Sequence, residues 1–83
     1  MSFYVYILKS LNPNKGTYVG YTIDLKKRIA LHNSGKGAKF TRGYKWKIIY
    51  KKKFVSKNSA MSYEYKLKKN RKLRQSILKE VVF

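Results

Sequence analysis

The stretch TYVGYTIDLKKRIALH, residues 17–32, determines the predicted fold. Its first six residues alternate as in a β-strand, which places the hydroxyl of Tyr18 and the bare backbone of Gly20 on one face. The rest has helical spacing, and Arg28 and His32 fall within the apolar arc of that helix. A helix that only covered a sheet would turn both residues toward solvent. The stretch therefore predicts a strand, a turn and a helix whose polar groups face inward.

The composition is that of one small domain, which we place at residues 1–83. Apolar residues make up 43% of the chain and aromatic residues 16%, which argues against disorder. The absence of cysteine excludes disulfides, a thiolate nucleophile and zinc sites built on thiolates. The first ten residues are too short and too aromatic for a signal peptide, and no apolar run reaches transmembrane length. We expect a cytoplasmic protein.

The charge is strongly positive. Twenty-one Lys and Arg residues face three acids, Asp24, Glu64 and Glu80, for a net charge of +18. Self-repulsion on this scale is tolerated best by a protein that binds a polyanion. We expect nucleic acid, DNA in the first place, as the partner, with ribosomal RNA or an anionic membrane surface as competing interpretations. No membrane partner is predicted, and we take a monomer as the default state.

The scarcity of acids also excludes mechanisms. A two-metal nuclease needs clustered carboxylates, which three scattered acids cannot supply. A single histidine excludes catalysis by a histidine pair. The chain lacks a P-loop, a dinucleotide fingerprint and a nucleophile elbow. Any catalysis must use tyrosine, arginine, one histidine and at most one carboxylate-bound metal.

Three segments have strand character. Residues 3–9 are β-branched and aromatic on both faces, which suits a central strand. The turn-rich residues 11–16 predict that residues 17–22 return as the second arm of a hairpin, although this loop is too long to fix the register. Residues 46–54 alternate as a third strand at or near a sheet edge, where lysines discourage pairing. Four residues of that strand are predicted to share its apolar face: Trp46, Ile48, Tyr50 and Phe54.

The first helix is predicted to begin after Asp24, an N-cap, and to end at His32 or Asn33 before Gly35. It is followed by GKGAKFTRGYK, residues 35–45. Two interpretations of this segment are open, a loop that cradles phosphates and a solvated basic linker. Its cations are Lys36, Lys39, Arg42 and Lys45.

A second helix, capped by Asn58 or Ser59, is predicted to run to Lys69. Its packing stripe includes a carboxylate, Glu64, which is costly to bury unless it is paired or bound to a metal. An ion pair with Lys68 or Arg28 is the structural alternative to metal binding. The stripe comprises Ala60, Met61, Glu64, Leu67, Lys68 and Arg71. From Asn70 onward a short final helix would bury Leu73, Ile77 and Leu78.

Taken together, these motifs resemble the small stand-alone single-domain branch of the GIY-YIG nuclease superfamily. Tyr4-Val5-Tyr6 stands at the first motif and Tyr18-Val19-Gly20 at the second. The segment DLKKRIALHNSGKGAKFTR, residues 24–42, matches the branch, as does the spacing of Ala60, Glu64 and Lys68. The resemblance covers nearly the whole chain. It implies an α/β (α+β) fold with a three-stranded antiparallel sheet flanked by helices, in the order β-β-α-β-α-α.

The resemblance also implies metal-dependent cleavage of a phosphodiester. Tyr18 would be the general base or orient the water, with Tyr6 supporting it. Arg28 would hold the scissile phosphate, because its planar fork suits phosphate oxygens. His32 would assist proton transfer or orient Tyr18. Glu64 would hold one divalent metal, Mg²⁺ or Mn²⁺, which suits the water-rich coordination of Mg²⁺.

Further positions complete the predicted site. Gly20 would leave room for the nucleic-acid backbone. Asn70 and Gln75 are the candidates for an asparagine that many members place on a late helix. The residues predicted to bind nucleic acid are Gly20, Lys36, Lys39, Arg42 and Lys68.

The first hypothesis for function is therefore a metal-dependent endonuclease acting on DNA, structure- or damage-directed rather than sequence-specific, as in DNA repair or recombination. The second is a non-catalytic nucleic-acid-binding module that keeps the fold, and the third is a ribosome-associated basic protein. An intact set of tyrosine, arginine, histidine and glutamate favours the enzyme. Lysines spread over the whole surface would favour binding alone.

Overall fold

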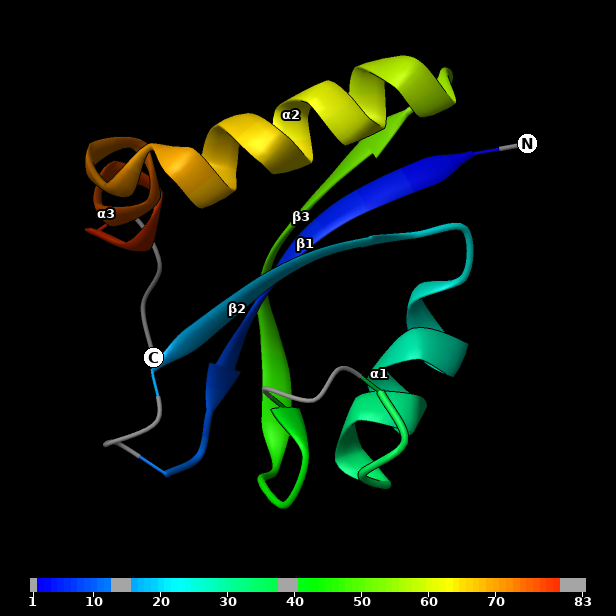
Figure 1. Cartoon of the computed structure of the whole chain (residues 1–83), viewed down its shortest axis with the longest axis vertical. Coiled ribbons are helices and arrows are strands. Elements are labelled where there is room, and N and C mark those ends of the chain that lie inside the picture. Colours follow the sequence, from blue (N-terminus) through cyan, green and yellow to red (C-terminus); the bar gives the residue numbers. More distant parts are fainter. Residues whose placement is uncertain (1, 13–15, 38–40, 80–83) are drawn as a thin grey trace.

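The computed structural model describes residues 2–12, 16–37 and 41–79, with an antiparallel sheet at its centre (Figure 1). Within these residues the sheet has three strands, β1 (Phe3–Ser10), β2 (Thr17–Thr22) and β3 (Trp46–Phe54), in the order β2-β1-β3. The predicted antiparallel sheet is confirmed, and the β-branched first segment is its central strand.

Three helices flank the sheet in the described part of the chain: α1 (Leu25–Asn33), α2 (Lys57–Lys69) and α3 (Arg71–Lys79). The order β-β-α-β-α-α is as predicted. Helix α1 lies on one side of the sheet, and α2 with α3 lies on the other (Figure 1). Arg74 ties α3 to α2, because its guanidinium donates to the carbonyl oxygen of Lys68 at 3.2 Å.

Because both faces of the sheet are covered, β1 contributes to two cores. Val5 and Ile7 point toward α2, where Ala60 and Leu67 complete a fully buried cluster. Alternate residues of the same strand point toward α1. That second cluster contains Tyr6, Leu8 and Trp46, with Tyr18, Leu25 and Ile29 packed against it.

Strand β3 contains a bulge that changes which side chains share a face. Ile7 lies opposite Tyr50 and Leu8 opposite Ile48, so Ile49 is an extra residue in β3. Trp46 and Ile48 pack on the α1 side, whereas Tyr50 and Phe54 pack on the α2 side. The prediction of one apolar face for these four residues is therefore wrong, because the inserted residue reverses the alternation.

The boundaries of α1 follow its predicted signals. The Asp24 carboxylate accepts a hydrogen bond from the backbone N–H of Lys27 at 3.1 Å. Beyond the C-terminal end, Gly35 adopts φ +83°, a left-handed conformation that glycine tolerates best. Both the cap and the stop predicted for this helix are confirmed.

Helix α2 begins earlier than predicted. Ser56, not Asn58 or Ser59, is its N-cap, and the Ser56 hydroxyl accepts from the backbone N–H of Ser59 at 3.4 Å. Met61 is 46% exposed, so the predicted stripe is also wrong at that position. Asn70 caps the next helix, because its side-chain oxygen accepts from the backbone N–H of Leu73 at 2.9 Å.

Helix α3 packs as predicted where it is described. Leu73 and Ile77 lie against the α2-side core. The side chain of Leu78 falls outside the described part of the structure.

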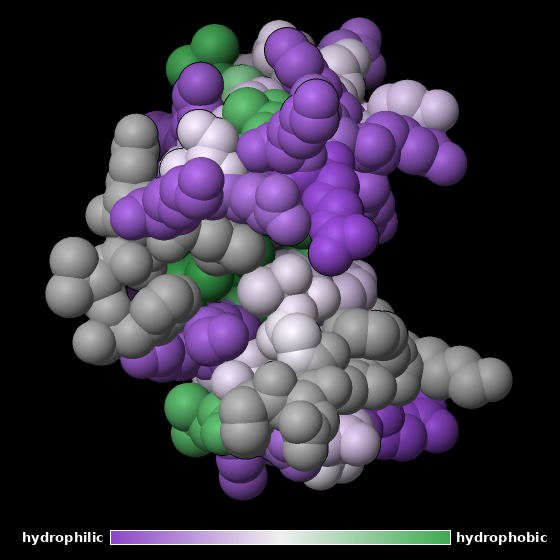
Figure 2. All heavy atoms as spheres, turned by 90° about the vertical axis from the view of Figure 1, so that its left-hand side faces the viewer, coloured by the Kyte–Doolittle hydropathy of each residue, from purple (hydrophilic) through white to green (hydrophobic). Residues whose placement is uncertain are grey.

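The surface is dominated by hydrophilic side chains. Figure 2 shows them gathered over the part of one face where Figure 1 places α2 and α3. Helices α2 and α3 carry eight basic residues, all of them exposed except the half-buried Arg74: Lys57, Lys66, Lys68, Lys69, Arg71, Lys72, Arg74 and Lys79. No described helix has the length and apolar character needed to span a bilayer.

Candidate functional site

The site is organised around a glycine beneath a tyrosine ring. Tyr6 on β1 lies directly opposite Gly20 on β2. A Cβ atom at Gly20 would collide with the hydroxyl end of Tyr6 and lie 3.0 Å from the Tyr18 ring. The tyrosines can share this side of the sheet only because residue 20 has no side chain. The space that a side chain at residue 20 would fill is occupied by the Tyr6 hydroxyl, and nucleic-acid binding at Gly20 stays a prediction.

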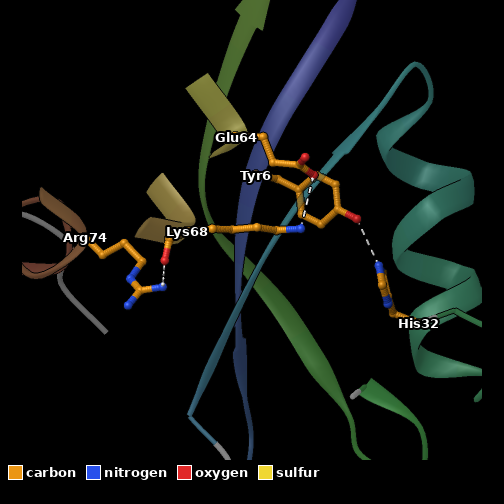
Figure 3. A network of polar contacts seen from close by, with 5 residues as sticks. All are labelled: Tyr6, His32, Glu64, Lys68 and Arg74. Carbon is orange, nitrogen blue, oxygen red and sulfur yellow. Dashed lines mark hydrogen bonds and ion pairs between the residues drawn. The ribbon is translucent and has the colours of Figure 1, made fainter. Parts of the chain in front are cut away.

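His32 joins these tyrosines from α1. Its Nε2 lies 2.9 Å from the Tyr6 hydroxyl, and the tyrosine points at the imidazole in Figure 3. Its Nδ1 lies 2.8 Å from the hydroxyl of Thr41. The Tyr18 and His32 ring centroids are 5.1 Å apart. His32 is completely buried, so both ring nitrogens are used inside the protein.

Burial also determines the charge of this histidine. Removing the ring from water lowers the pKa of His32, and the nearby positive charge of Arg28 lowers that pKa further. His32 is therefore neutral at pH 7, with one N–H donor and one acceptor nitrogen.

Arg28 completes the group from the preceding turn of α1. A hydrogen bond with Tyr6 raises the pKa of Arg28, burial opposes this effect, and the hydroxyl of Tyr18 adds a smaller interaction in the same direction as Tyr6. Among the described residues, Arg28 forms no ion pair with a carboxylate. Its Nε is buried and has no hydrogen-bond partner in that part of the chain. A buried unpaired donor is rare and points to a function beyond stability.

The hydroxyl of Tyr6 stays protonated at neutral pH. Burial raises the pKa of Tyr6, and the hydrogen bond from Arg28 opposes that rise. The charges of Tyr18 and Glu64 also act on Tyr6 and raise its pKa. The charge of the Glu64 carboxylate therefore reaches Tyr6, although its effect is the smallest of those acting on that hydroxyl.

Glu64 itself lies on α2 and is half-buried. Its carboxylate is 3.7 Å from the ammonium of Lys68, one turn further along the helix (Figure 3). The Glu64 side chain is 21% exposed and that of Lys68 is 47% exposed. The structural alternative raised from the sequence, a pair with Lys68, is thus present. At this exposure and distance such a pair is weak, and it leaves the carboxylate accessible.

The metal-binding capacity of the site is limited to a single carboxylate. Within the described residues no cluster of three or more His, Cys, Asp or Glu side chains occurs. Zinc and calcium sites usually draw on several such side chains. The partly exposed carboxylate of Glu64 does fit Mg²⁺, which keeps several waters and accepts one or two protein oxygens.

A cavity of about 260 Å³ lies beside Arg28. It is lined by Thr22, Ile23, Asp24, Lys27, Arg28 and Leu31. One side of Arg28 is therefore buried against Tyr6. Its other side borders the open cavity, which the cation Lys27 also lines.

A family model described as the GIY-YIG catalytic domain matches residues 2–76. This chain belongs to the GIY-YIG family. A UPF0213 protein of Oceanobacillus iheyensis is 46% identical over 66 residues, 78% of this chain and 74% of the relative. A UPF0213 protein of Streptococcus pneumoniae is 46% identical over 70 residues, 83% of this chain and 69% of the relative.

A solved structure supports the same assignment. The solution NMR structure of a UPF0213 protein from Bacillus halodurans is 40% identical and superimposes with a TM-score of 0.54. The match covers 94% of this chain and 82% of that one. The GIY-YIG fold expected from the motifs is therefore the fold of the chain.

Not every predicted position of the GIY-YIG site gathers at this point. Lys36 and Arg42 are exposed on the segment after α1, and Lys39 lies outside the described residues. Asn70 is used as a helix cap, and Gln75 is exposed on α3. Sequence reasoning missed Thr41 and Gly37, both of which contact His32. The glycine-rich spacing after α1 was the available signal, and it was interpreted only as a phosphate loop or a linker.

Proposed function

We propose that this GIY-YIG protein is a metal-dependent endonuclease that hydrolyses phosphodiester bonds in DNA. The observation that supports it most is Arg28, which interacts with two tyrosine hydroxyls and pairs with no carboxylate in the described residues. Buried charges in proteins are usually paired with an opposite charge. An arginine that lacks one retains its charge for an external anion, and a phosphate matches its fork geometry.

The burial of the two tyrosines supports different roles for them. Tyr6 is 1% exposed and remains protonated, so it supports and positions its neighbours. Tyr18 is half-buried and can meet substrate. In our assignment Tyr18 orients the attacking water or takes its proton, and Arg28 binds the scissile phosphate and stabilises the charge that develops on it.

His32 acts from inside the protein in this assignment. Because the imidazole is completely buried, it does not meet the substrate. Its bond to Tyr6 and its ring contact with Tyr18 support the orienting role over proton transfer to the substrate.

Glu64 is the residue we assign to the divalent metal, Mg²⁺ or Mn²⁺. The ion would supply Lewis-acid stabilisation next to the leaving oxygen. The carboxylate fits this role because it is accessible and its ion pair with Lys68 is weak. Lys36, Arg42 and Lys68 would contact phosphates along the strand, and Lys39 keeps that predicted role from the sequence.

Branched, damaged or single-stranded DNA is the substrate class we propose. The described residues form a sheet with three helices and no additional module that could read base sequence. Structure-directed cutting, as in DNA repair or recombination, needs only shape and charge.

One observation favours a second candidate, a non-catalytic nucleic-acid-binding module. Exposed lysines or arginines occur on all three described helices and on β3, so the positive charge is not confined to the site. A spread charge supports binding of nucleic acid without supporting cleavage.

The deciding experiment is a cleavage assay on supercoiled, single-stranded, flapped and four-way-junction DNA, with Mg²⁺ or Mn²⁺. We expect metal-dependent cutting that Glu64→Gln reduces by about 100-fold or more, with nearly unchanged DNA affinity. The matched control is Ser62→Lys, which adds the same unit of positive charge at an exposed position of the same helix.

Cutting by Glu64→Gln at the wild-type rate would show that the metal assignment is wrong. No cutting by any variant, together with tight salt-sensitive binding, would favour the binding module.

A further inference from the structure

A row of polar groups runs through the interior between α1 and the sheet. The positive charge of Arg28 acts on the Tyr6 hydroxyl, which lies 2.9 Å from His32 Nε2, and His32 Nδ1 lies 2.8 Å from the Thr41 hydroxyl. Tyr6 is 1% exposed, and His32 and Thr41 are not exposed at all. Water therefore cannot complete the bonds between Tyr6, His32 and Thr41, and each proton shared along them needs a protein acceptor.

The chemistry of the groups sets the direction of the protons. A guanidinium is positively charged and can only donate, so the Tyr6 hydroxyl turns its lone pairs, and not its proton, toward Arg28. The single hydroxyl proton of Tyr6 then needs an acceptor, and among the described residues the group positioned to accept it is His32 Nε2. A neutral imidazole that accepts at Nε2 carries its own proton on Nδ1. That N–H donates to the hydroxyl of Thr41.

We infer that Thr41 is a positioning residue of the active site: by accepting from Nδ1–H it fixes the tautomer of His32 and thereby the proton of Tyr6. The expected effect of Thr41 on catalysis rests on the proposed nuclease function. The assigned tautomer of His32 rests on the geometry and charges of the neighbouring groups.

Thr41 is held firmly enough for this role. Its backbone oxygen accepts from the indole N–H of Trp46 at 2.9 Å and from the backbone N–H of Tyr44 at 3.4 Å. Trp46 is in turn tied to the end of α1, because its backbone N–H donates to the side-chain oxygen of Asn33 at 2.6 Å. The threonine is thus anchored to the helix that carries His32.

Gly37 makes the arrangement sterically possible. A Cβ atom there would press on Nδ1 of His32 and lie 3.0 Å from its Cα. The backbone at Gly37 therefore passes close to the side of the ring that carries Nδ1. This close approach gives Gly37 a role in the site that a solvated linker would not need.

The consequence for catalysis lies in Tyr6 and Arg28. With its proton directed at His32, the Tyr6 oxygen presents a lone pair to Arg28 and holds the guanidinium beside Tyr18. Without the Thr41 hydroxyl, the tautomer with the proton on Nε2 would be favoured. Two donors would then compete for the Tyr6 oxygen. We expect kcat to fall about tenfold, equivalent to about 1.4 kcal/mol of transition-state stabilisation, with KM unchanged.

The test compares Thr41→Val, which keeps the shape and removes the hydroxyl, with Thr41→Ser, which keeps the hydroxyl. The primary readout is the tautomer of His32 from the ¹⁵N chemical shifts of its ring, which are unambiguous because the chain has one histidine. We expect wild type and Thr41→Ser to be protonated on Nδ1, and Thr41→Val to shift toward protonation on Nε2. Steady-state cleavage of the preferred DNA substrate is the second readout.

Protonation of Nε2 in the wild-type protein would overturn the inference, as would an unchanged tautomer in folded Thr41→Val. If Thr41→Val does not fold, the spectra of wild type and Thr41→Ser still decide. A changed tautomer with an unchanged kcat would overturn the proposed effect of Thr41 on catalysis. A wild-type protein that cuts no DNA would remove the nuclease proposal but leave the tautomer result standing, so the two failures are distinguishable.

Discussion

His32 is the residue whose charge the fold controls most directly. Burial and the neighbouring Arg28 lower its pKa below the ordinary value of 6.5. Between that value and the folded pKa, the unfolded chain binds a proton that the folded chain does not, so stability rises with pH. The contribution is fully present above about pH 6.5 and is lost as the pH falls toward the folded pKa.

We therefore expect the free energy of unfolding to decrease between pH 7 and pH 5, with a slope of at most about 1.4 kcal/mol per pH unit. Urea unfolding at several pH values measures this slope. His32→Gln is the control and should remove the slope, because no other side chain in the sequence has an ordinary pKa near 6. If the variant does not fold, NMR titration of His32 in the wild type replaces it. A titration midpoint above 6.5 would contradict the prediction.

At the scale of elements, the sequence predicted most of the fold from local signals. The strand 17–22 and the strand 46–54 have the predicted boundaries, and α1 has the predicted cap. Local chemistry determines these features, since a capping carboxylate or a run of β-branched residues acts within a few positions. Tyr18, Arg28 and His32 were also correctly predicted to face inward, because one strand–turn–helix unit carries them.

The features that the sequence did not predict depend on contacts between elements. The pairing of Tyr6 with Gly20 needs the register of β1 and β2, which the intervening loop leaves open. The β3 bulge at Ile49 exists only relative to β1. The contact between Thr41 and His32 joins residues nine apart that share no helix or strand, and periodicity carries no information about such a contact.

The cap of α2 shows how a nearby element shifts a boundary. Strand β3 ends at Phe54, and Ser56 is the first hydroxyl residue with an extended backbone after it, so the helix begins there. We expect Ser56→Ala to lower the free energy of unfolding by about 1 kcal/mol. Asn58→Ala is the matched control. It should change the free energy of unfolding by no more than a few tenths of a kcal/mol, because Asn58 is an exposed helical residue. Thermal or urea unfolding measures both, and a larger loss from Asn58→Ala would contradict the assigned cap.

At the scale of the whole molecule, the net charge of +18 has to be reconciled with one small site. Cations on every helix give the protein a long-range attraction for any polyanion. Only those near Arg28 and Glu64 would contact a bound strand in the proposed complex. The segment after α1, which carries Lys36, is tied to that helix because the Lys36 backbone N–H donates to Leu31 at 3.0 Å. In Figure 1, α3 lies on the opposite side of the sheet from α1.

The salt dependence of binding separates contacts from background charge. Each phosphate contact on duplex DNA contributes about −0.9 to the slope of log K against log salt concentration. We expect Lys36→Gln to reduce the magnitude of that slope by about 0.9, and Lys72→Gln, an equal charge change on exposed α3, to leave it unchanged. Fluorescence anisotropy with a labelled four-way junction measures the slope for both variants, at salt concentrations between about 50 and 200 mM. Equal reductions in the two variants would mean that DNA is held by the whole basic surface, which is the behaviour of a binding module.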